Sequence, residues 1–183
     1  MVSRQPGRRR ALATPVRSLL PLLFFCILAD TASAQNNGCV VQAATSPQRQ
    51  VLRCRDGLTI EAEPGSTFSL VDRNRDTVPD AVNLQGRAVL IDAPPRALRQ
   101  GFQVQTPQAI AAVRGTQWVV DVSTGKTAVF VVSGRVSVRR TTNARGVNLG
   151  PGEGVDVDQG SAPLVVRRWP APRASALLAR FGR

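Results

Sequence analysis

The sequence predicts an all-β domain whose short strands wind into a twisted β-roll or solenoid, or into a sandwich-like domain, followed by a short C-terminal helix. Three observations support this prediction. Apolar and polar residues alternate in many short segments, turns recur about every 8 to 12 residues, and no long segment shows a helical period. This pattern favours antiparallel strands over alternating strands and helices.

The first 34 residues have the layout of a secretory signal peptide. Arginines precede the apolar run LLPLLFFCILA, and small residues then lead to Gln35, so we expect cleavage after Ala34. The apolar run has 11 residues, whereas a membrane-spanning helix needs roughly 20. A retained membrane anchor is the alternative. The mature protein is therefore expected to be exported, without an integral membrane segment.

Composition restricts the classes of partner. The chain has 183 residues, with 24 basic and 12 acidic side chains and no histidine. The part after the signal peptide is long enough for one domain with its own core. Its basic residues are almost all arginines, scattered singly or in pairs, whereas nucleic-acid binders concentrate theirs on one face. We therefore expect no nucleic-acid partner and a general attraction to anionic polymers.

Cys39 and Cys54 remain after the predicted cleavage. In an oxidising compartment such a pair is expected to form a disulfide. Closing a loop of about 15 residues stabilises a fold by about 3 kcal/mol. Two cysteines without histidine make a poor zinc site. The sequence thus predicts a structural disulfide and no cofactor.

The first predicted strands follow the disulfide. In residues 57–63, GLTIEAE, apolar side chains occupy alternate positions, which places Glu61 and Glu63 on the solvent side. Residues 81–93, AVNLQGRAVLIDA, are expected to form two strands hinged near Gln85-Gly86.

Two later segments are apolar on both faces. They are TQWVVDV, residues 116–122, and TAVFVV, residues 127–132. A strand that is apolar on both faces is covered on both faces, so these strands are expected at the centre of the domain. Ser133-Gly134 then predicts a hairpin.

The chain ends with a helical signal. In the final segment, APRASALLARFGR, apolar residues recur at spacings of three and four: Leu177, Leu178 and Phe181. This spacing predicts a short amphipathic helix after Pro172. We expect its apolar side to seal one end of the β domain.

The stretch TPQAIAAVRGTQWVVDV, residues 106–122, carries no group suited to catalysis. Gly115 permits a positive φ or a close backbone approach, so the chain can turn between AIAAV and TQWVV. Arg114 is expected to brace this corner by a charge-assisted hydrogen bond. A ligand-reading role for Arg114 is the alternative.

Three motifs in order resemble the signature of the FecR domain: TPQAIAAVRGTQWVVDV, KTAVFVVSGRVSV and VNLGPGEGVDV. The motif positions are Thr106, Pro107, Val113, Arg114, Gly115, Thr116, Gly134, Gly152 and Glu153. The resemblance implies a periplasmic all-β domain. In the founding family this domain senses the state of an outer-membrane iron–siderophore receptor. It passes that state through a membrane helix to a cytoplasmic segment that controls a sigma factor.

This sequence departs from that pattern, because few residues precede the apolar run and a cytoplasmic sigma-binding segment is therefore not expected. What carries over is the extracytoplasmic domain. Without histidine or tyrosine, direct iron ligation is not expected. The expected organisation is a signal peptide (1–34), disulfide-stapled N-terminal strands (35–56), a FecR-like β domain (57–165) and a tail with a short helix (166–183).

A calcium loop is a weaker candidate site. Within DRNRDTVPD, four oxygen-bearing side chains follow the spacing of such loops: Asp72, Asn74, Asp76 and Asp80. Thr77 stands where these loops prefer glycine, and Arg73 and Arg75 add positive charge. A polar turn with internal salt bridges is therefore the preferred interpretation.

Catalysis is not expected either. The chain has no histidine for general acid–base chemistry and no nucleophile elbow or phosphate loop. Its carboxylates lie at positions typical of solubility rather than chemistry.

We therefore expect a non-catalytic, exported FecR-domain protein that acts as a periplasmic binding or sensor module, accessory to envelope signal transduction. Its partner is expected to be an envelope protein, such as a receptor or membrane regulator, or an envelope polymer. Exposed strand edges and rim arginines would make the contacts, with Arg114, Arg135, Arg139 and Arg140 as candidates. The alternatives are a β-barrel that holds a small anionic ligand inside the roll, with Arg114 pointing inward, and a calcium-stabilised envelope scaffold domain.

Overall fold

The computed structural model describes residues 38–95, 101–113 and 115–183. The predicted signal peptide and Arg114 lie outside these ranges. Within them, no helix is long and apolar enough to cross a membrane. The strands are β1 (Val40–Thr45), β2 (Gln48–Arg53), β3 (Thr59–Ala62), β4 (Thr67–Val71), β5 (Ala81–Ala93), β6 (Phe102–Gln105), β7 (Ala109–Val113), β8 (Thr116–Ser123), β9 (Lys126–Ser133), β10 (Val136–Arg140), β11 (Gly146–Leu149), β12 (Glu153–Asp158) and β13 (Arg167–Arg168). A 3₁₀ turn η1 (Arg55–Gly57) and one α-helix, α1 (Ala171–Ala179), complete the described elements.

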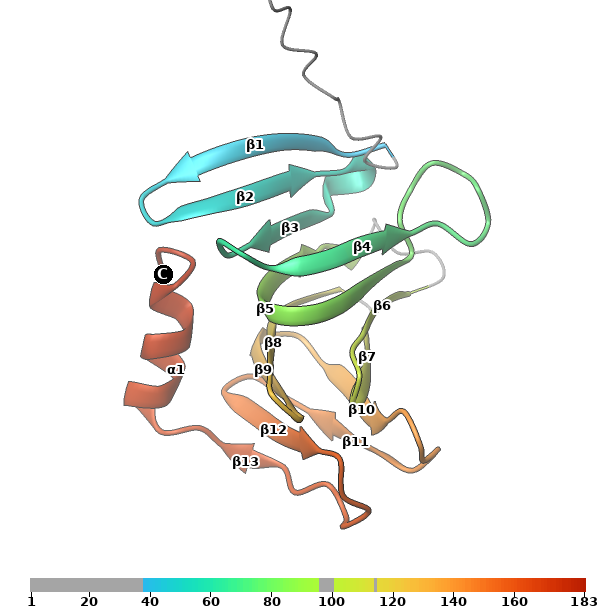
Figure 1. Ribbon diagram of the computed structural model, residues 1–183, viewed down its shortest axis with the longest axis vertical. Helices are drawn as coiled ribbons and strands as arrows, with labels where there is room; N and C mark the ends of the chain where they lie inside the picture. The colour runs from blue at the N-terminus through green and yellow to red at the C-terminus, as the bar shows by residue number, and fades with distance from the viewer. Residues whose placement is uncertain (1–37, 96–100, 114) are drawn as a thin grey trace, which may run out of the picture. The chain divides into compact units, whose positions relative to one another are not determined.

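The predicted all-β fold is confirmed, and the sheet curls into two facing layers with α1 outside one of them (Figure 1). We call the first the helix-covered layer, in the order β1–β2–β3–β5–β8–β9–β12–β13. The second is the open layer, in the order β4–β5–β6–β7–β10–β11. Neighbouring strands pair antiparallel except β5 and β6, which are parallel.

Strand β5 belongs to both layers. It runs unbroken through 13 residues, so the expected division into two strands is wrong, although the expected hinge position is where the pairing changes. The first part, up to Gly86, pairs with β4, and Ala81–Asn83 pair with β6. The second part, from Arg87, pairs with β8 and β3. Arg87 has a φ of 67°, which bends the strand without ending it.

The core lies between the two layers and is almost entirely apolar. Trp118 of β8 packs edge-on against Phe102 of β6, with ring centroids 6.2 Å apart. Around this pair lie buried valines, leucines and isoleucines from both layers. Because the space inside the roll is filled by these side chains, the structure does not support an anionic ligand held there.

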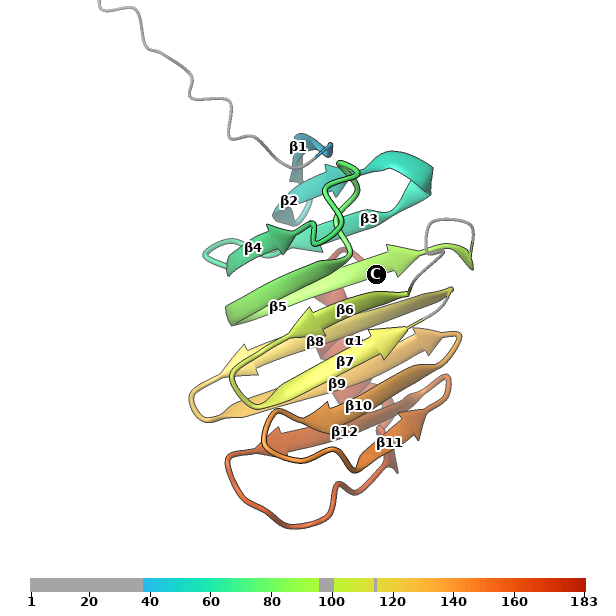
Figure 2. The ribbon, with the colours of Figure 1, turned by 90° about the vertical axis from the view of Figure 1, so that its right-hand side faces the viewer.

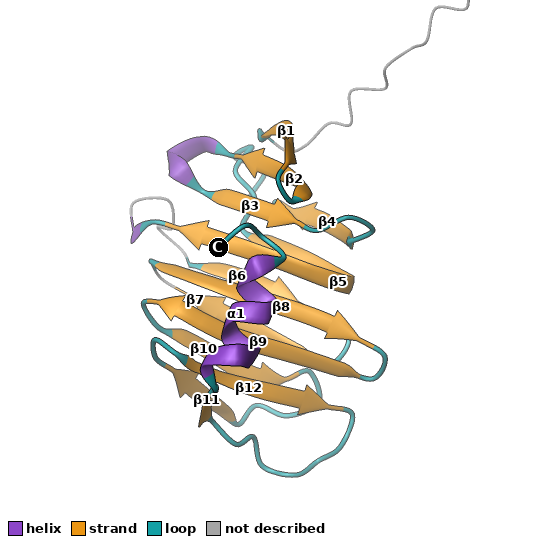
Figure 3. Cartoon of the chain, turned by 90° about the vertical axis from the view of Figure 1, so that its left-hand side faces the viewer, coloured by secondary structure: helices purple, strands orange, loops and turns teal. Residues whose placement is uncertain are grey.

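A second apolar cluster lies on the outer side of the helix-covered layer. Leu177 and Phe181 are buried against Leu90, Val119 and Phe130 of the sheet. The expected centre of the domain is thus confirmed, since β8 and β9 are covered on both faces. Helix α1 lies across this sheet face (Figure 3) and does not seal an end of the β domain, so that expectation is wrong. The outward-facing apolar side chains of β8 and β9 provide the surface it covers.

The predicted disulfide is confirmed between Cys39 and Cys54, 15 residues apart in sequence. It joins the start of β1 to the end of β2. Strand β1 is otherwise exposed, since Val40 is 63% exposed and the strand pairs only with β2. The disulfide therefore fastens an edge hairpin that has little core of its own.

Candidate binding face

The outer side of the open layer is the candidate binding face, because no described element covers it. Figure 2 looks onto this side, with β6, β7, β10 and β11 toward the viewer and α1 behind. The side chains that point outward alternate with buried ones along each strand. We define the polar face by these outward residues: Gln103, Gln105, Ile110, Ala112, Ser137, Arg139 and Asn148.

Strand register arranges these residues in rows. Gln103, Ala112, Ser137 and Asn148 are successive neighbours across β6, β7, β10 and β11. In the next row Gln105 lies opposite Ile110, which lies opposite Arg139. None of these four strands contains aspartate or glutamate. The face therefore offers hydrogen-bonding groups and positive charge without a carboxylate of its own.

A hollow of about 400 Å³ opens on the polar face. Arg135, Gln103, Ser137, Asn148 and Ala112 are among the residues that line it. Amides, a hydroxyl and a guanidinium are therefore available at the hollow. The hollow can accept a polar group that carries acceptor oxygens.

The four arginines expected to bind do not share one environment. Arg135 and Arg139 are exposed on or beside the polar face, and neither side chain has an ion-pair partner among the described residues. Arg140 follows Arg139 but points the other way and is only 5% exposed, so it is not at the rim as expected. Arg114 lies outside the described residues.

The expected motif residues build the corner between the layers. The chain crosses from β7 to β8 near Gly115 and back from β9 to β10 near Gly134. Thr116 Oγ1 donates to the carbonyl oxygen of Arg135 at 3.0 Å and accepts from its backbone N–H at 3.3 Å. A Cβ atom on Gly134 would lie 2.6 Å from the carbonyl oxygen of Gly115. Thr116 and the two glycines thus hold the two crossings side by side.

A buried threonine pair joins the layers elsewhere. The Oγ1 atoms of Thr106 and Thr127 are 2.8 Å apart and share a hydrogen bond. Thr106 Oγ1 also accepts from the backbone N–H of Ala109 at 2.9 Å, and Thr127 Oγ1 donates to Gln108 Oε1 at 2.8 Å. This network fixes the β6–β7 turn of the open layer against the start of strand β9.

The glycine-rich turn before β12 is closed in a similar way. Glu153 Oε2 accepts from the backbone N–H of Gly150 at 2.7 Å, and the N–H of Gly152 donates to the carbonyl oxygen of Val131 at 2.9 Å. These contacts give the motif residues a structural role.

A family model described as FecR protein matches residues 41–137, more than half of the chain. The chain belongs to the FecR family. Membership in this family supports a role in signal transduction. No curated protein sequence compared with the chain matches it.

The FecR-family fold of this chain is similar to solved structures. Two crystal structures of a candidate anti-sigma factor from Parabacteroides distasonis, at 1.65 and 2.50 Å resolution, each match with a TM-score of 0.56 and 17% sequence identity. The match covers 76% of this chain and 64% of each neighbour. This FecR-family chain therefore spans slightly less than two thirds of the length of these neighbours and shares their fold.

The alternation of apolar and polar residues wrongly predicted the location of two glutamates of this FecR-family protein. Glu61 and Glu63 are 5% and 8% exposed, not on the solvent side as expected. Arg49 and Arg183 bind Glu61, and Arg180 binds Glu63. The paired arginines neutralise the carboxylates, which allows burial at the margin of the helix.

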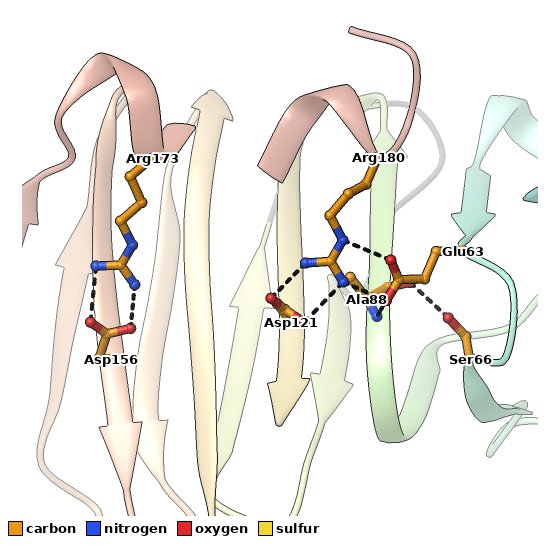
Figure 4. A network of polar contacts seen from close by, with 7 residues as sticks. All are labelled: Glu63, Ser66, Ala88, Asp121, Asp156, Arg173 and Arg180. Atoms are coloured by element: carbon orange, nitrogen blue, oxygen red, sulfur yellow. Dashed lines mark hydrogen bonds and ion pairs between the residues drawn. The ribbon is translucent and has the colours of Figure 1, made fainter. Parts of the chain in front are cut away.

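Figure 4 shows the centre of this network, which we call the helix clasp: Glu63, Asp121, Asp156, Arg173 and Arg180. Arg180 bridges Glu63 and Asp121, with Nε 2.7 Å from Glu63 Oε2 and Nη1 2.7 Å from Asp121 Oδ2. The hydrogen bonds to Glu63 raise the pKa of Arg180 above its usual value, against partial desolvation. The clasp fastens α1 to the sheet.

The other end of the clasp is more exposed. Arg173 holds Asp156 through two hydrogen bonds, of 3.0 and 2.6 Å, and stacks over Trp169 with its Cζ 3.5 Å from the ring centroid. Partial burial tends to raise the pKa of Asp156, but the hydrogen bond and charge of Arg173, together with Lys126, outweigh it and lower the pKa below 3.8.

The DRNRDTVPD loop folds through its own side chains. Asp72 accepts from the backbone N–H of Thr77 at 2.9 Å, Asp76 from that of Val78 at 2.8 Å, and Asp80 from that of Arg73 at 2.8 Å. Among the described residues, no group of three or more histidine, cysteine, aspartate or glutamate side chains is arranged to hold a metal ion. One oxygen of Asp72 and one of Asp80 are nevertheless buried without a hydrogen-bond partner.

The residues missed by sequence reasoning are the uncharged ones of the polar face. Gln103 lies outside the quoted motifs, and Ser137 and Asn148 lie within them but not at motif positions. For Gln103 and Ser137 the signal is the alternation of FQVQ and VSVR, in which every second residue is polar, and Asn148 likewise lies between two apolar residues in VNL. That pattern predicts a half-exposed strand, and only the fold shows that these strands lie side by side.

Proposed function

We propose that this FecR-family protein is a non-catalytic binding module of the periplasm, accessory to envelope signal transduction, and that its polar face docks an acidic segment of an envelope protein. One observation carries the proposal. The uncovered sheet face presents Arg135 and Arg139 without ion-pair partners in the described residues. Arg135 lines a hollow together with amides and a hydroxyl, and Arg139 lies in the next row of the face. A carboxylate-bearing partner would supply the missing negative charge.

The disulfide supports the proposed compartment, because such bonds persist in oxidising surroundings. Family membership supports a regulatory role. The structural neighbours are named as candidate anti-sigma factors, and that name suggests the same class of process for this chain.

The carboxylates support the absence of catalysis. Six acidic residues in or next to the strands are engaged in the structure: Glu61, Glu63, Asp121, Glu153, Asp156 and Asp158. Five are held by arginines, and the sixth accepts from a backbone N–H. A general acid needs a pKa raised toward neutrality, whereas contacts with arginine lower the pKa of Asp158 and, against partial burial, that of Asp156.

The test is affinity capture from envelope extract with Arg135→Glu/Arg139→Glu. We expect the wild-type protein to retain an envelope protein, and the double variant to lose it, because charge reversal repels an acidic segment. The matched control is Arg53→Glu/Arg167→Glu, which makes the same charge change at exposed strands of the helix-covered layer. Equal capture by both double variants refutes the polar face as the docking site. Recovery of glycan alone would replace the protein partner with an envelope polymer.

A calcium-stabilised scaffold is the second candidate function. It rests on one oxygen of Asp72 and one of Asp80 that are buried without a hydrogen bond. The arginines of the same loop oppose it, and Asp80 already pairs with Arg73, 3.6 Å away. A melting temperature that rises with calcium in the wild type but not in Asp80→Ala would establish this candidate. Identical melting curves with calcium and with chelator would exclude a calcium-stabilised scaffold.

A further inference from the structure

A small cavity lies at the far end of β10, away from the polar hollow. It has a volume of about 220 Å³ and is enclosed by the turn between β10 and β11 and by the segment that follows β12. Four side chains with hydrogen-bond donors line it: Arg140, Asn143, Arg145 and Ser161. Its lining contains no aspartate or glutamate.

Arg140 is a buried cation, and one of its three guanidinium nitrogens has no hydrogen-bond partner. Its Nη1 donates to the carboxylate of Asp158 at 2.8 Å and also to the carbonyl oxygen of that residue, and its Nη2 donates to the carbonyl oxygen of Ala162 at 3.0 Å. Its Nε is buried and has no hydrogen-bond partner. A buried donor on a charged group is costly to leave unpaired, and such groups often mark the place of a water or an ion.

The neighbouring groups are also donors. Arg145 is exposed, and its side chain makes no hydrogen bond or ion pair within the described residues. Asn143 uses its carbonyl oxygen to accept from the backbone N–H of Arg145 at 2.9 Å, which leaves its amide Nδ2 as a donor. Asp158 balances the charge of Arg140, so the charge of Arg145 remains uncompensated.

We propose that this cavity binds an oxyanion, the carboxylate or phosphate group of a small molecule or chain end. The oxyanion accepts from Nε of Arg140, from the guanidinium of Arg145 and from Asn143. Such charge-assisted bonds to arginine suit both kinds of anion. This site lies apart from the polar face and does not depend on its proposed partner.

The experiment titrates the purified protein with sodium phosphate and, separately, with sodium acetate, while NMR follows the Nε–H signal of Arg140. We expect a saturable shift with at least one anion. Arg145→Gln should weaken this binding about tenfold, which corresponds to about 1.4 kcal/mol. The control is Arg167→Gln, which removes the same charge from an exposed residue outside both the cavity and the polar face, and it should leave the affinity unchanged.

The outcomes separate the alternatives. A response to phosphate alone assigns a phosphate site, and a response to both anions assigns a general oxyanion site. The proposal is wrong if neither anion gives a saturable shift, or if Arg167→Gln and Arg145→Gln weaken binding equally, since the latter result shows only general electrostatic attraction.

Discussion

Gly134 illustrates how much a single position contributes at the corner between the layers. It has a φ of 85°, where a residue with a side chain loses about 1–2 kcal/mol. An added Cβ would also meet the carbonyl oxygen of Gly115 at 2.6 Å. We expect Gly134→Ala to lower the free energy of unfolding by more than the conformational term alone, as measured by urea denaturation.

Gly86 provides the matched control for that substitution. It lies within β5, a Cβ there would contact no heavy atom within 4 Å, and its φ is not positive. Gly86→Ala should be neutral or stabilising by about 0.5–1 kcal/mol, because alanine loses less conformational freedom on folding. If both variants lost a similar free energy of unfolding, position 134 would not specifically require glycine.

The ion pair between Arg173 and Asp156 predicts a pH dependence. The pKa of Asp156 in the folded protein lies below its ordinary 3.8, so the pair contributes stability above that pH and loses it as the pH falls through the lowered pKa. We expect Arg173→Gln to be less stable than wild type near neutral pH, and the difference to shrink below about pH 3.8.

Urea denaturation of both proteins across the acidic range tests this. A residual difference should persist in acid, because the stacking of Arg173 on Trp169 does not depend on Asp156. A difference that stays constant from neutral to acidic pH would show that the pair contributes nothing.

At the scale of residues, the sequence predicts the glycine corner but not the buried carboxylates. Gly115 can be recognised as a turn residue because it lies between two apolar runs. Glu61 and Glu63 look solvent-facing because alternation considers one strand alone. Their partners Arg180 and Arg183 lie 117 and 122 residues away in sequence, and no local pattern links them.

At the scale of elements, the disulfide hairpin gives a clear prediction. Strand β1 is exposed and forms strand hydrogen bonds only with β2. The disulfide between Cys39 and Cys54 stabilises this hairpin by restricting the unfolded chain. Replacing both cysteines with alanine should lower the free energy of unfolding by about 3 kcal/mol, as expected for a loop of this length. Denaturation of the wild type with reductant present should reproduce the loss. An unchanged free energy of unfolding in both experiments would mean that the disulfide does not stabilise the hairpin.

Most strands could be predicted from their alternation and turn residues, since a half-buried strand repeats every two residues. The bend in β5 could not, because a strand that changes partners keeps its local pattern. The place of α1 could not either. Its spacing identifies an apolar stripe, but the surface that receives it is built by strands distant in sequence.

At the scale of the whole molecule, the proposed export has a direct test. If the protein is processed after Ala34, mass spectrometry of the native protein from the envelope fraction should give an N terminus at Gln35. The same sample should contain no free thiol at Cys39 or Cys54. An N terminus at Met1 in a membrane fraction would instead support the retained anchor.

The polar face shows what the whole fold adds to the sequence. Each of its strands is recognisable alone, but the sequence does not say that β6, β7, β10 and β11 are neighbours. Their order skips from β7 to β10, because β8 and β9 cross to the other layer between them. Function assigned from motif residues would therefore select the corner and overlook the face.

The continuity of β5 has a mechanical consequence. One chain segment is hydrogen-bonded into both layers, so separating the layers requires breaking the pairing on at least one side of its bend. The β domain should consequently melt as one cooperative unit. A mechanical force that pulls on the open layer is transmitted through the backbone of β5 to the helix-covered layer, whose outer face carries α1.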